Sequence, residues 1–143
     1  GVVVFGNQSQ QLQEQLPFHV YPLPYIKNEH EIVNIYNAVD LFVIPSLEEN
    51  LPNMVMEAMS CGVPCVGFNT GGIPEMIDHL HNGYVAQRKS SEDLANGIHW
   101  VLTEPEYAEL SAQACRKAIG NYSESIIAKK YTDVYNKITG KYA

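Results

Sequence analysis

The chain has 143 residues, of which 45% are hydrophobic and 17% are charged, and its formal net charge is −7. This is an ordinary globular balance with room for a real core, and the negative charge argues against binding nucleic acid or an anionic membrane through a broad basic surface. No apolar run approaches the roughly 18 residues of a membrane span. The odd number of cysteines, three, argues against a disulfide framework, so we expect a reducing cytoplasm.

Strand and helix patterns alternate along the chain, with short apolar runs indicating buried strands. In chain order we expect a strand at 2–5, a polar helix at 8–15, a strand at 19–21, a rigid loop at 21–25, a helix at 29–37, a strand at 41–44, a helix at 52–60, a strand at 65–68, a short helix from 74 to 77, an edge-like strand at 84–86 and helices at 91–102, 105–119 and 123–138. This alternation predicts an α/β fold with a doubly wound, Rossmann-like parallel sheet, in one domain spanning 1–143.

Two sequence signals refine these boundaries. Gly62 suits the left-handed residue that ends a helix, and Pro64 prevents the helix from continuing. In the last helix four apolar residues follow the i, i+4, i+7, i+11 spacing of one buried face: Ile127, Tyr131, Val134 and Ile138.

Two glutamates stand out between the strand at 41–44 and the end of the next helix. Glu49 lies in the polar loop at the carboxyl end of the strand, and Glu57 lies about two turns into the helix. In open α/β sheets, ligands bind in the crevice beyond the carboxyl ends of the strands, which is where this loop lies. Carboxylates accept hydrogen bonds from hydroxyls, and a helix start offers N–H groups to phosphate. Hydroxyls together with phosphate describe a sugar nucleotide.

The residues around this pair also form an ordered series of motifs. Glu49 and Glu57 are followed by an Ala-Met-x-x-Gly-x-Pro run at 58–64, by Thr-Gly-Gly-Ile-Pro-Glu at 70–75 and by Asn-Gly-Tyr-Val at 82–85. This series resembles the nucleotide-sugar-binding, C-terminal half of retaining glycosyltransferases of the GT-B fold, in glycosyltransferase family 4, also called glycosyl transferases group 1. The resemblance covers nearly the whole chain.

The resemblance implies a role for each matching residue. Glu57 is expected to bind the two ribose hydroxyls of the donor, and Glu49 to act catalytically, contacting the donor sugar and stabilising positive charge near the anomeric carbon. The further donor-binding residues are expected to be Asn50, Leu51, Pro52, Asn53, Gly71, Gly72, Tyr25 and Ile26. The family usually has glycine where this chain has Asn50, but asparagine tolerates a positive φ better than most residues.

Simpler interpretations stay open for most of these residues. Glu57 lies on an otherwise apolar segment, so a buried carboxylate there should face a ligand or a cation, but an exposed helix glutamate is the alternative. Asn53 also fits a plain helix start, and the Gly71-Gly72 pair fits a simple turn. Tyr25 and Ile26 also fit packing under the proline-rich loop.

Positive charge is scarce in the first part of the chain. Before Arg88 the only Lys or Arg is Lys27, although a diphosphate normally requires such cations. In the family they sit in a strand–helix unit that precedes a strand like 2–5. We therefore expect a fragment that lacks the first strand and helix of the C-terminal half and the acceptor-binding N-terminal domain. We also expect the strand at 2–5 to close the resulting gap by pairing directly with the strand at 41–44.

Other chemistries find little support in the sequence. His79, His81 and Asp78 are spaced closely enough for metal ligands, but their segment is typical of a solvated loop. Cys61 and Cys65 lack the second pair of residues that a zinc site needs. No Asp-x-Asp, nucleophile-elbow or Walker motif occurs. We expect neither a metal nor a cofactor beyond the nucleotide diphosphate sugar, which is the substrate.

We therefore expect the donor-binding domain of a retaining glycosyltransferase that transfers a sugar to a glycan or lipid-linked acceptor, as in polysaccharide biosynthesis. The isolated chain is expected to be inactive, and any membrane contact, at the inner face, to come through the missing domain. A sugar-nucleotide epimerase of similar fold and a non-catalytic α/β interaction module are the alternatives.

Overall fold

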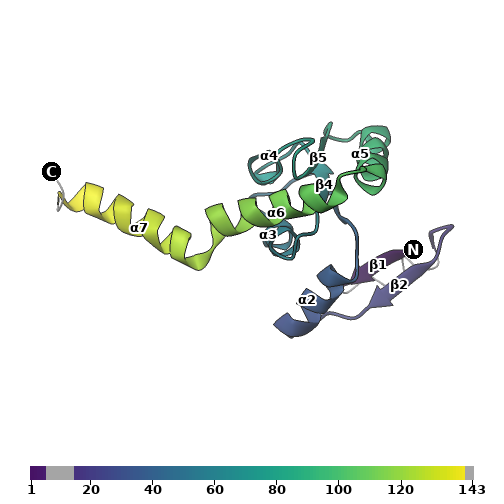
Figure 1. Ribbon diagram of the computed structural model, residues 1–143, viewed down its shortest axis with the longest axis horizontal. Helices are drawn as coiled ribbons and strands as arrows, with labels where there is room; N and C mark the ends of the chain where they lie inside the picture. The colour runs from purple at the N-terminus through teal and green to yellow at the C-terminus, as the bar shows by residue number, and fades with distance from the viewer. Residues whose placement is uncertain (6–14, 141–143) are drawn as a thin grey trace. The chain divides into compact units, whose positions relative to one another are not determined.

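The computed structural model describes residues 1–5 and 15–140 (Figure 1). The chain forms two compact units, Gly1–Val39 and Asp40–Ala143, which are taken separately below. The helix predicted at 8–15 lies outside the described residues except for its last position. No helix among the described residues combines the length and the apolar character that crossing a bilayer requires.

The first unit contains two parallel strands, β1 (Val2–Phe5) and β2 (Val20–Leu23), with Val2 opposite Val20. β2 begins one residue later than predicted and continues through Pro22, which the sequence placed in a rigid loop. Proline has no N–H to donate, so a strand carries it where that position needs no ladder bond. In the described ladder β2 pairs with β1 alone, which leaves its other side able to accommodate the proline.

The helix of this unit, α2 (Glu29–Asn37), has the predicted bounds. Asn28 caps it, because its side-chain oxygen accepts a hydrogen bond of 3.0 Å from the His30 N–H. Tyr36 is fully buried, while Ile32 and Ile35 are half-buried. The predicted inward face of α2 is therefore confirmed.

The second unit is built on a three-stranded parallel sheet with the order β3-β4-β5. The strands are β3 (Phe42–Ile44), β4 (Cys65–Phe68) and β5 (Gly83–Ala86). Three short apolar runs predicted them within a residue, and every residue of the central strand β4 is buried. A strand buried on both faces is typical of a parallel sheet with helices on each side.

Helices cover both faces of this sheet (Figure 1). The helices are α3 (Asn53–Ser60), α4 (Ile73–Met76), α5 (Ser91–Thr103) and α6 (Tyr107–Tyr122). Along β4, Val66 packs with Val101 of α5 and Leu110 of α6, while the next residue, Gly67, faces Ile73 of α4. α6 also packs along α3. This two-sided cover confirms the α/β, Rossmann-like architecture with parallel strands.

The end of α3 follows the sequence signals. The helix stops at Ser60, and Gly62 has a φ of +75°, in the left-handed region that glycine adopts without strain. The Ser111 hydroxyl on α6 donates a hydrogen bond of 2.6 Å to the Gly62 carbonyl oxygen. The predicted stop therefore also fixes the contact between α3 and α6.

The last helix, α7 (Glu124–Thr139), differs from the expectation. It has no buried residue, and the face predicted to be buried is mostly exposed: Tyr131 by 64%, Val134 by 55% and Ile138 by 77%. Only Ile127 of the four predicted residues is half-buried. Helical periodicity identifies the face that seeks an apolar partner, but it does not say that the partner belongs to this chain.

The predicted pairing of the strand at 2–5 with the strand at 41–44 is wrong. In the described ladders β1 pairs with β2, and β3 pairs with β4. Each of these pairs joins strands that are consecutive within their own compact unit, and such short connections are the commonest way for parallel strands to find a neighbour.

Candidate functional site

The candidate site lies at the carboxyl ends of β3, β4 and β5, where the loop 45–52 leads from β3 into α3. Parallel strands bring their carboxyl ends to one edge, so the segments that follow β3, β4 and β5 meet there. We call this edge the strand-end edge and define it by the segments 45–52, 69–72 and 87–90. Glu49 lies in the first of these segments and is half-buried.

The Gly71-Gly72 turn packs directly against the Glu49 loop. Gly71 has a φ of +51°, and a Cβ built on it would overlap the carbonyl oxygen of Glu49. The Gly72 N–H donates a hydrogen bond of 2.5 Å to the Asn50 carbonyl oxygen. Only glycine permits this approach, so the structure brings Gly71 and Gly72 together with Glu49 and Asn50. The absence of side chains at Gly71 and Gly72 makes room for the loop, and their contact with a donor stays a prediction.

A second set of contacts holds the same loop at Leu47. The carbonyl oxygen of Leu47 accepts hydrogen bonds from Thr70 Oγ1 at 3.1 Å, from Arg88 Nε at 3.3 Å and from Arg88 Nη2 at 3.1 Å. Sequence reasoning did not select Arg88 or the Thr70 hydroxyl for the site. The signal available was their position, since each lies two residues beyond the end of its strand.

Glu57 lies in the second turn of α3 and is exposed. The argument that a buried carboxylate must face a ligand or cation therefore does not apply, and the alternative of an exposed helix glutamate describes its surroundings better. The reason is the pattern of α3, in which Val55, Ala58 and Met59 are buried on the face opposite to Glu57. Its role stays a prediction from the motif.

The remaining predicted residues of this loop lie at the start of α3. Pro52 is buried and is the N-cap residue, and it provides no side-chain hydrogen bond to the helix. Asn50, Leu51 and Asn53 are exposed, and Leu51 lies against the Gly72 backbone. Their positions beside Glu49 are those predicted, and their contacts with a donor stay a prediction.

Tyr25 and Ile26 belong to the other compact unit, Gly1–Val39, and are described within it. They follow β2 and precede α2. Tyr25 is 67% exposed and Ile26 is half-buried. The exposure of Tyr25 does not fit the alternative in which its ring packs under the proline-rich loop.

The start of α5 is anchored at the strand-end edge by Asp93. Its carboxylate accepts hydrogen bonds from the Gln87 N–H at 2.6 Å and from the Tyr84 hydroxyl at 2.8 Å. These hydrogen bonds, chiefly the one from the Gln87 N–H and to a smaller extent the one from the Tyr84 hydroxyl, lower the pKa of the Asp93 carboxyl below its usual value. The same hydrogen bond raises the pKa of the Tyr84 hydroxyl. Asp93 therefore ties the end of β5 to α5 as an ionised carboxylate.

The histidine-rich loop has protein partners for its polar groups. Asp78 pairs with Lys117 at 2.5 Å and with the buried Asn82, and His79 Nδ1 accepts a hydrogen bond of 3.1 Å from the Val85 N–H. His81 is exposed. Among the described residues, no three His, Cys, Asp or Glu side chains gather as metal ligands would.

Cys61 directly follows α3, and Cys65 is the first residue of β4. Cys65 is fully buried in β4, Cys61 is half-buried after α3, and burial raises the pKa of both thiols. A thiol with a raised pKa is a poor nucleophile and metal ligand at neutral pH. The surroundings of Cys61 and Cys65 fit a packing role.

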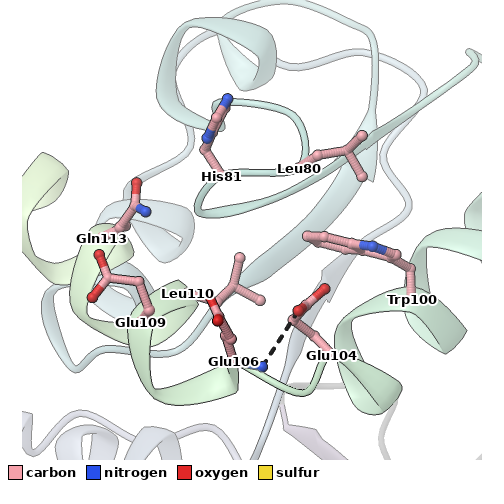
Figure 2. A pocket seen from close by; sticks show the side chains of 8 residues that line it. All are labelled: Leu80, His81, Trp100, Glu104, Glu106, Glu109, Leu110 and Gln113. Atoms are coloured by element: carbon pink, nitrogen blue, oxygen red, sulfur yellow. Dashed lines mark hydrogen bonds between the residues drawn. The ribbon is translucent and has the colours of Figure 1, made fainter.

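A small pocket of about 120 Å³ lies elsewhere in the second unit (Figure 2). It is lined by Leu80, His81, Trp100, Glu104, Glu106, Glu109, Leu110 and Gln113. These residues come from the 78–83 loop, the end of α5 and the start of α6. None of them belongs to the strand-end edge, so the pocket is distinct from the candidate site.

Comparison with known proteins identifies the family. The model of the family described as glycosyl transferases group 1 matches residues 2–119. The chain belongs to this family. It is 31% identical over 115 residues to the N,N'-diacetylbacillosaminyl-diphospho-undecaprenol alpha-1,3-N-acetylgalactosaminyltransferase of Campylobacter jejuni, covering 80% of this chain and 30% of that protein.

A second family member shows the same partial coverage. The chain is 27% identical over 107 residues to the D-inositol 3-phosphate glycosyltransferase of Saccharomonospora viridis, covering 75% of this chain and 25% of that protein. The chain thus spans less than a third of the length of either curated relative.

Solved structures of glycosyltransferases share the fold. HepE of Anabaena, in complex with UDP and glucose, superposes with a TM-score of 0.79 at 22% identity, covering 94% of this chain and 40% of that one. The C-terminal domain of the group 1 protein LpcC from Francisella tularensis gives a TM-score of 0.68 at 23% identity, covering 80% and 60%. The chain therefore has the fold of the C-terminal half of GT-B glycosyltransferases.

Proposed function

We propose that this chain is the donor-binding domain, 1–143, of a retaining glycosyltransferase that moves a sugar from a nucleotide diphosphate sugar to a glycan or lipid-linked acceptor. The observation that carries the proposal is the half-buried Glu49, held at the strand-end edge by the Gly71-Gly72 turn in a chain of this family. Relatives that transfer sugars and a neighbour that binds UDP and glucose support it.

The proposed division of labour follows from the two positions. Glu49, in the loop, faces positive charge that develops near the anomeric carbon as the bond to the diphosphate breaks. Glu57, on α3, accepts hydrogen bonds from the ribose hydroxyls of the donor in the ground state and in the transition state alike. Asn50, Leu51, Pro52 and Asn53 line the helix start beside the donor. Gly71 and Gly72 contribute by leaving space for the backbone of the Glu49 loop.

The proposal also assigns the remaining parts of the reaction. The acceptor, any membrane contact at the inner face and the main diphosphate cations belong to a part of the enzyme outside this chain, and Tyr25 and Ile26 border the nucleobase. We propose a cytoplasmic enzyme of polysaccharide biosynthesis that needs no cofactor and no metal. The chain by itself is then inactive, because catalysis needs the donor held against an acceptor.

The test compares two glutamates in the complete enzyme. Glu49→Gln should lower kcat about a hundredfold with little change in donor KM, because the charge it balances develops only in the transition state. Glu57→Gln should raise the donor KM and the dissociation constant of UDP about tenfold with a smaller effect on kcat, because it removes uniform binding. Steady-state kinetics and calorimetric titration with UDP measure both.

Matched variants and rival functions sharpen this test. Glu48→Gln changes the neighbouring exposed carboxylate, and Glu106→Gln changes an exposed one at the start of α6, so both should leave kcat and KM unchanged. The opposite assignment of effects to Glu49 and Glu57 would mean that their roles are exchanged. Interconversion of UDP-sugars without an acceptor would indicate an epimerase, and no binding of any nucleotide would indicate an interaction module.

A further inference from the structure

The Leu47 carbonyl oxygen is a point where all three segments of the strand-end edge meet. Thr70 reaches it from the segment after β4, and Arg88 reaches it from the segment after β5. The carbonyl itself lies in the segment after β3, two residues before Glu49. We call these three hydrogen bonds the Leu47 clamp.

The clamp is suited to fixing a backbone position. Arg88 donates through two nitrogens of one planar group, and a charged donor makes a stronger hydrogen bond than a neutral one. Thr70 is β-branched, so few side-chain rotamers are open to its hydroxyl. Leu47 itself is 47% exposed, so its side chain contributes little packing to hold the loop. The hydrogen bonds of the clamp therefore fix the backbone at Leu47, which its exposed side chain does not.

The other side of the same loop is fixed by the Gly71-Gly72 turn. The backbone around Glu49 is therefore held at Leu47 by the clamp and at Asn50 by the Gly72 N–H. Glu49 lies between these two points. A loop held at both ends of the four-residue stretch 47–50 keeps the backbone of Glu49 in a narrow range of positions.

We propose that Arg88 and Thr70 are positioning residues for Glu49, acting through the Leu47 carbonyl. The inference rests on the proposed function, in which Glu49 faces the reacting carbon. Small displacements of a catalytic group are costly in rate, because the transition state requires a narrow geometry. Arg88 and Thr70 thus control turnover without touching the donor.

The variants that test this proposal are made in the complete enzyme. Arg88→Gln and Thr70→Val should each lower kcat about tenfold while the donor KM changes by less than about twofold. Thr70→Ser keeps the hydroxyl and should recover most of the turnover lost in Thr70→Val. Arg116→Gln removes the same charged group at an exposed position of α6, outside the strand-end edge, and should leave kcat and the donor KM unchanged, because Arg116 pairs with Glu109 on the same helix.

A double-mutant cycle with Glu49 separates positioning from general stability. In a Glu49→Gln background, Arg88→Gln should lower kcat by less than about twofold, because the residue through which it acts is gone. An equal loss of kcat in both backgrounds would overturn the proposal, as would a lower thermal midpoint with unchanged kcat. If Glu49→Gln itself leaves kcat unchanged, the proposed function fails together with the positioning proposal. If Glu49→Gln lowers kcat but the cycle shows no coupling, only the positioning proposal fails.

Discussion

The strand-end edge and the helix α7, both in the second unit, are held in different ways. At the edge, backbone groups of the Glu49 loop meet Thr70, Arg88 and the Gly71-Gly72 turn within hydrogen-bond or van der Waals distance. Along α7 no residue is buried, although its apolar residues are spaced as regularly as those of a core helix.

The difference shows that apolar periodicity and fixed position are separate properties. At the edge Leu47 is 47% exposed, yet hydrogen bonds to its carbonyl oxygen hold the backbone of the loop. α7 has an apolar face, but no residue of the helix is buried. Where a region is held by specific hydrogen bonds and close backbone approach, single substitutions should be costly; where it is not, they should be nearly neutral.

The largest effect is expected from Gly71→Ala. The new Cβ would overlap the Glu49 carbonyl oxygen, and alanine also disfavours the φ of +51°, so the free energy of unfolding should fall by about 3 kcal/mol. Chemical denaturation of the 143-residue chain measures this change.

Gly120→Ala is the matched control for this prediction. A Cβ at Gly120 meets nothing within 4 Å, and Gly120 lies in α6, so alanine should leave stability unchanged or raise it by up to about 1 kcal/mol. Equal effects at the two glycines would show that the close approach at Glu49 does not hold the edge together.

A second, smaller effect is expected from Asp93→Asn. Each carboxylate oxygen of Asp93 accepts one hydrogen bond, and an asparagine amide group can accept only one of the two. The free energy of unfolding near pH 7 should therefore fall by about 1.5 kcal/mol, in the lower part of the range for hydrogen bonds to charged groups, because the site is partly exposed. Asp133→Asn, at an exposed position on α7, should change it by less than about 0.5 kcal/mol.

The sign of the pH dependence follows from the lowered pKa of Asp93. The folded pKa lies below the unfolded value of about 3.9, so the stabilisation is complete above that value and is lost as the pH falls through the folded pKa. Denaturation between pH 6 and pH 2.5 should show the difference between wild type and Asp93→Asn shrinking below about pH 4. A difference that stays constant across that range would contradict the assignment.

Much of this molecule could be predicted from residue patterns. Short apolar runs located the strands of the second unit within a residue, because a strand buried on both faces must be apolar throughout. Gly62 and Pro64 fixed the end of α3. The motif around Glu49 indicated the strand-end edge, since segments that follow parallel strands meet at one edge of the sheet.

The rest depended on contacts that local patterns do not encode. The hydrogen bonds from Arg88 to Leu47 join residues 41 positions apart, and nothing in either segment identifies the partner. The apolar neighbours of Glu57 left a buried carboxylate and an exposed helix glutamate both open, and the structure places Glu57 on the exposed side of α3 with Met54. The strand at 2–5 was expected to pair with the strand at 41–44 because this would close a gap in the sheet, but in the described ladders it pairs with β2.

The smallest effect is expected on α7. Ile138 is 77% exposed, so Ile138→Ala removes little apolar area from contact and should change the free energy of unfolding of the 143-residue chain by less than about 0.5 kcal/mol. Met59→Ala, at a fully buried position of α3, should instead cost about 3 kcal/mol, because it leaves a cavity in the core. Chemical denaturation of both variants compares a buried apolar residue, Met59, with an exposed one, Ile138. A loss at Ile138 comparable to that at Met59 would show that the apolar face of α7 is buried in solution, and the comparison between α7 and the strand-end edge would no longer hold.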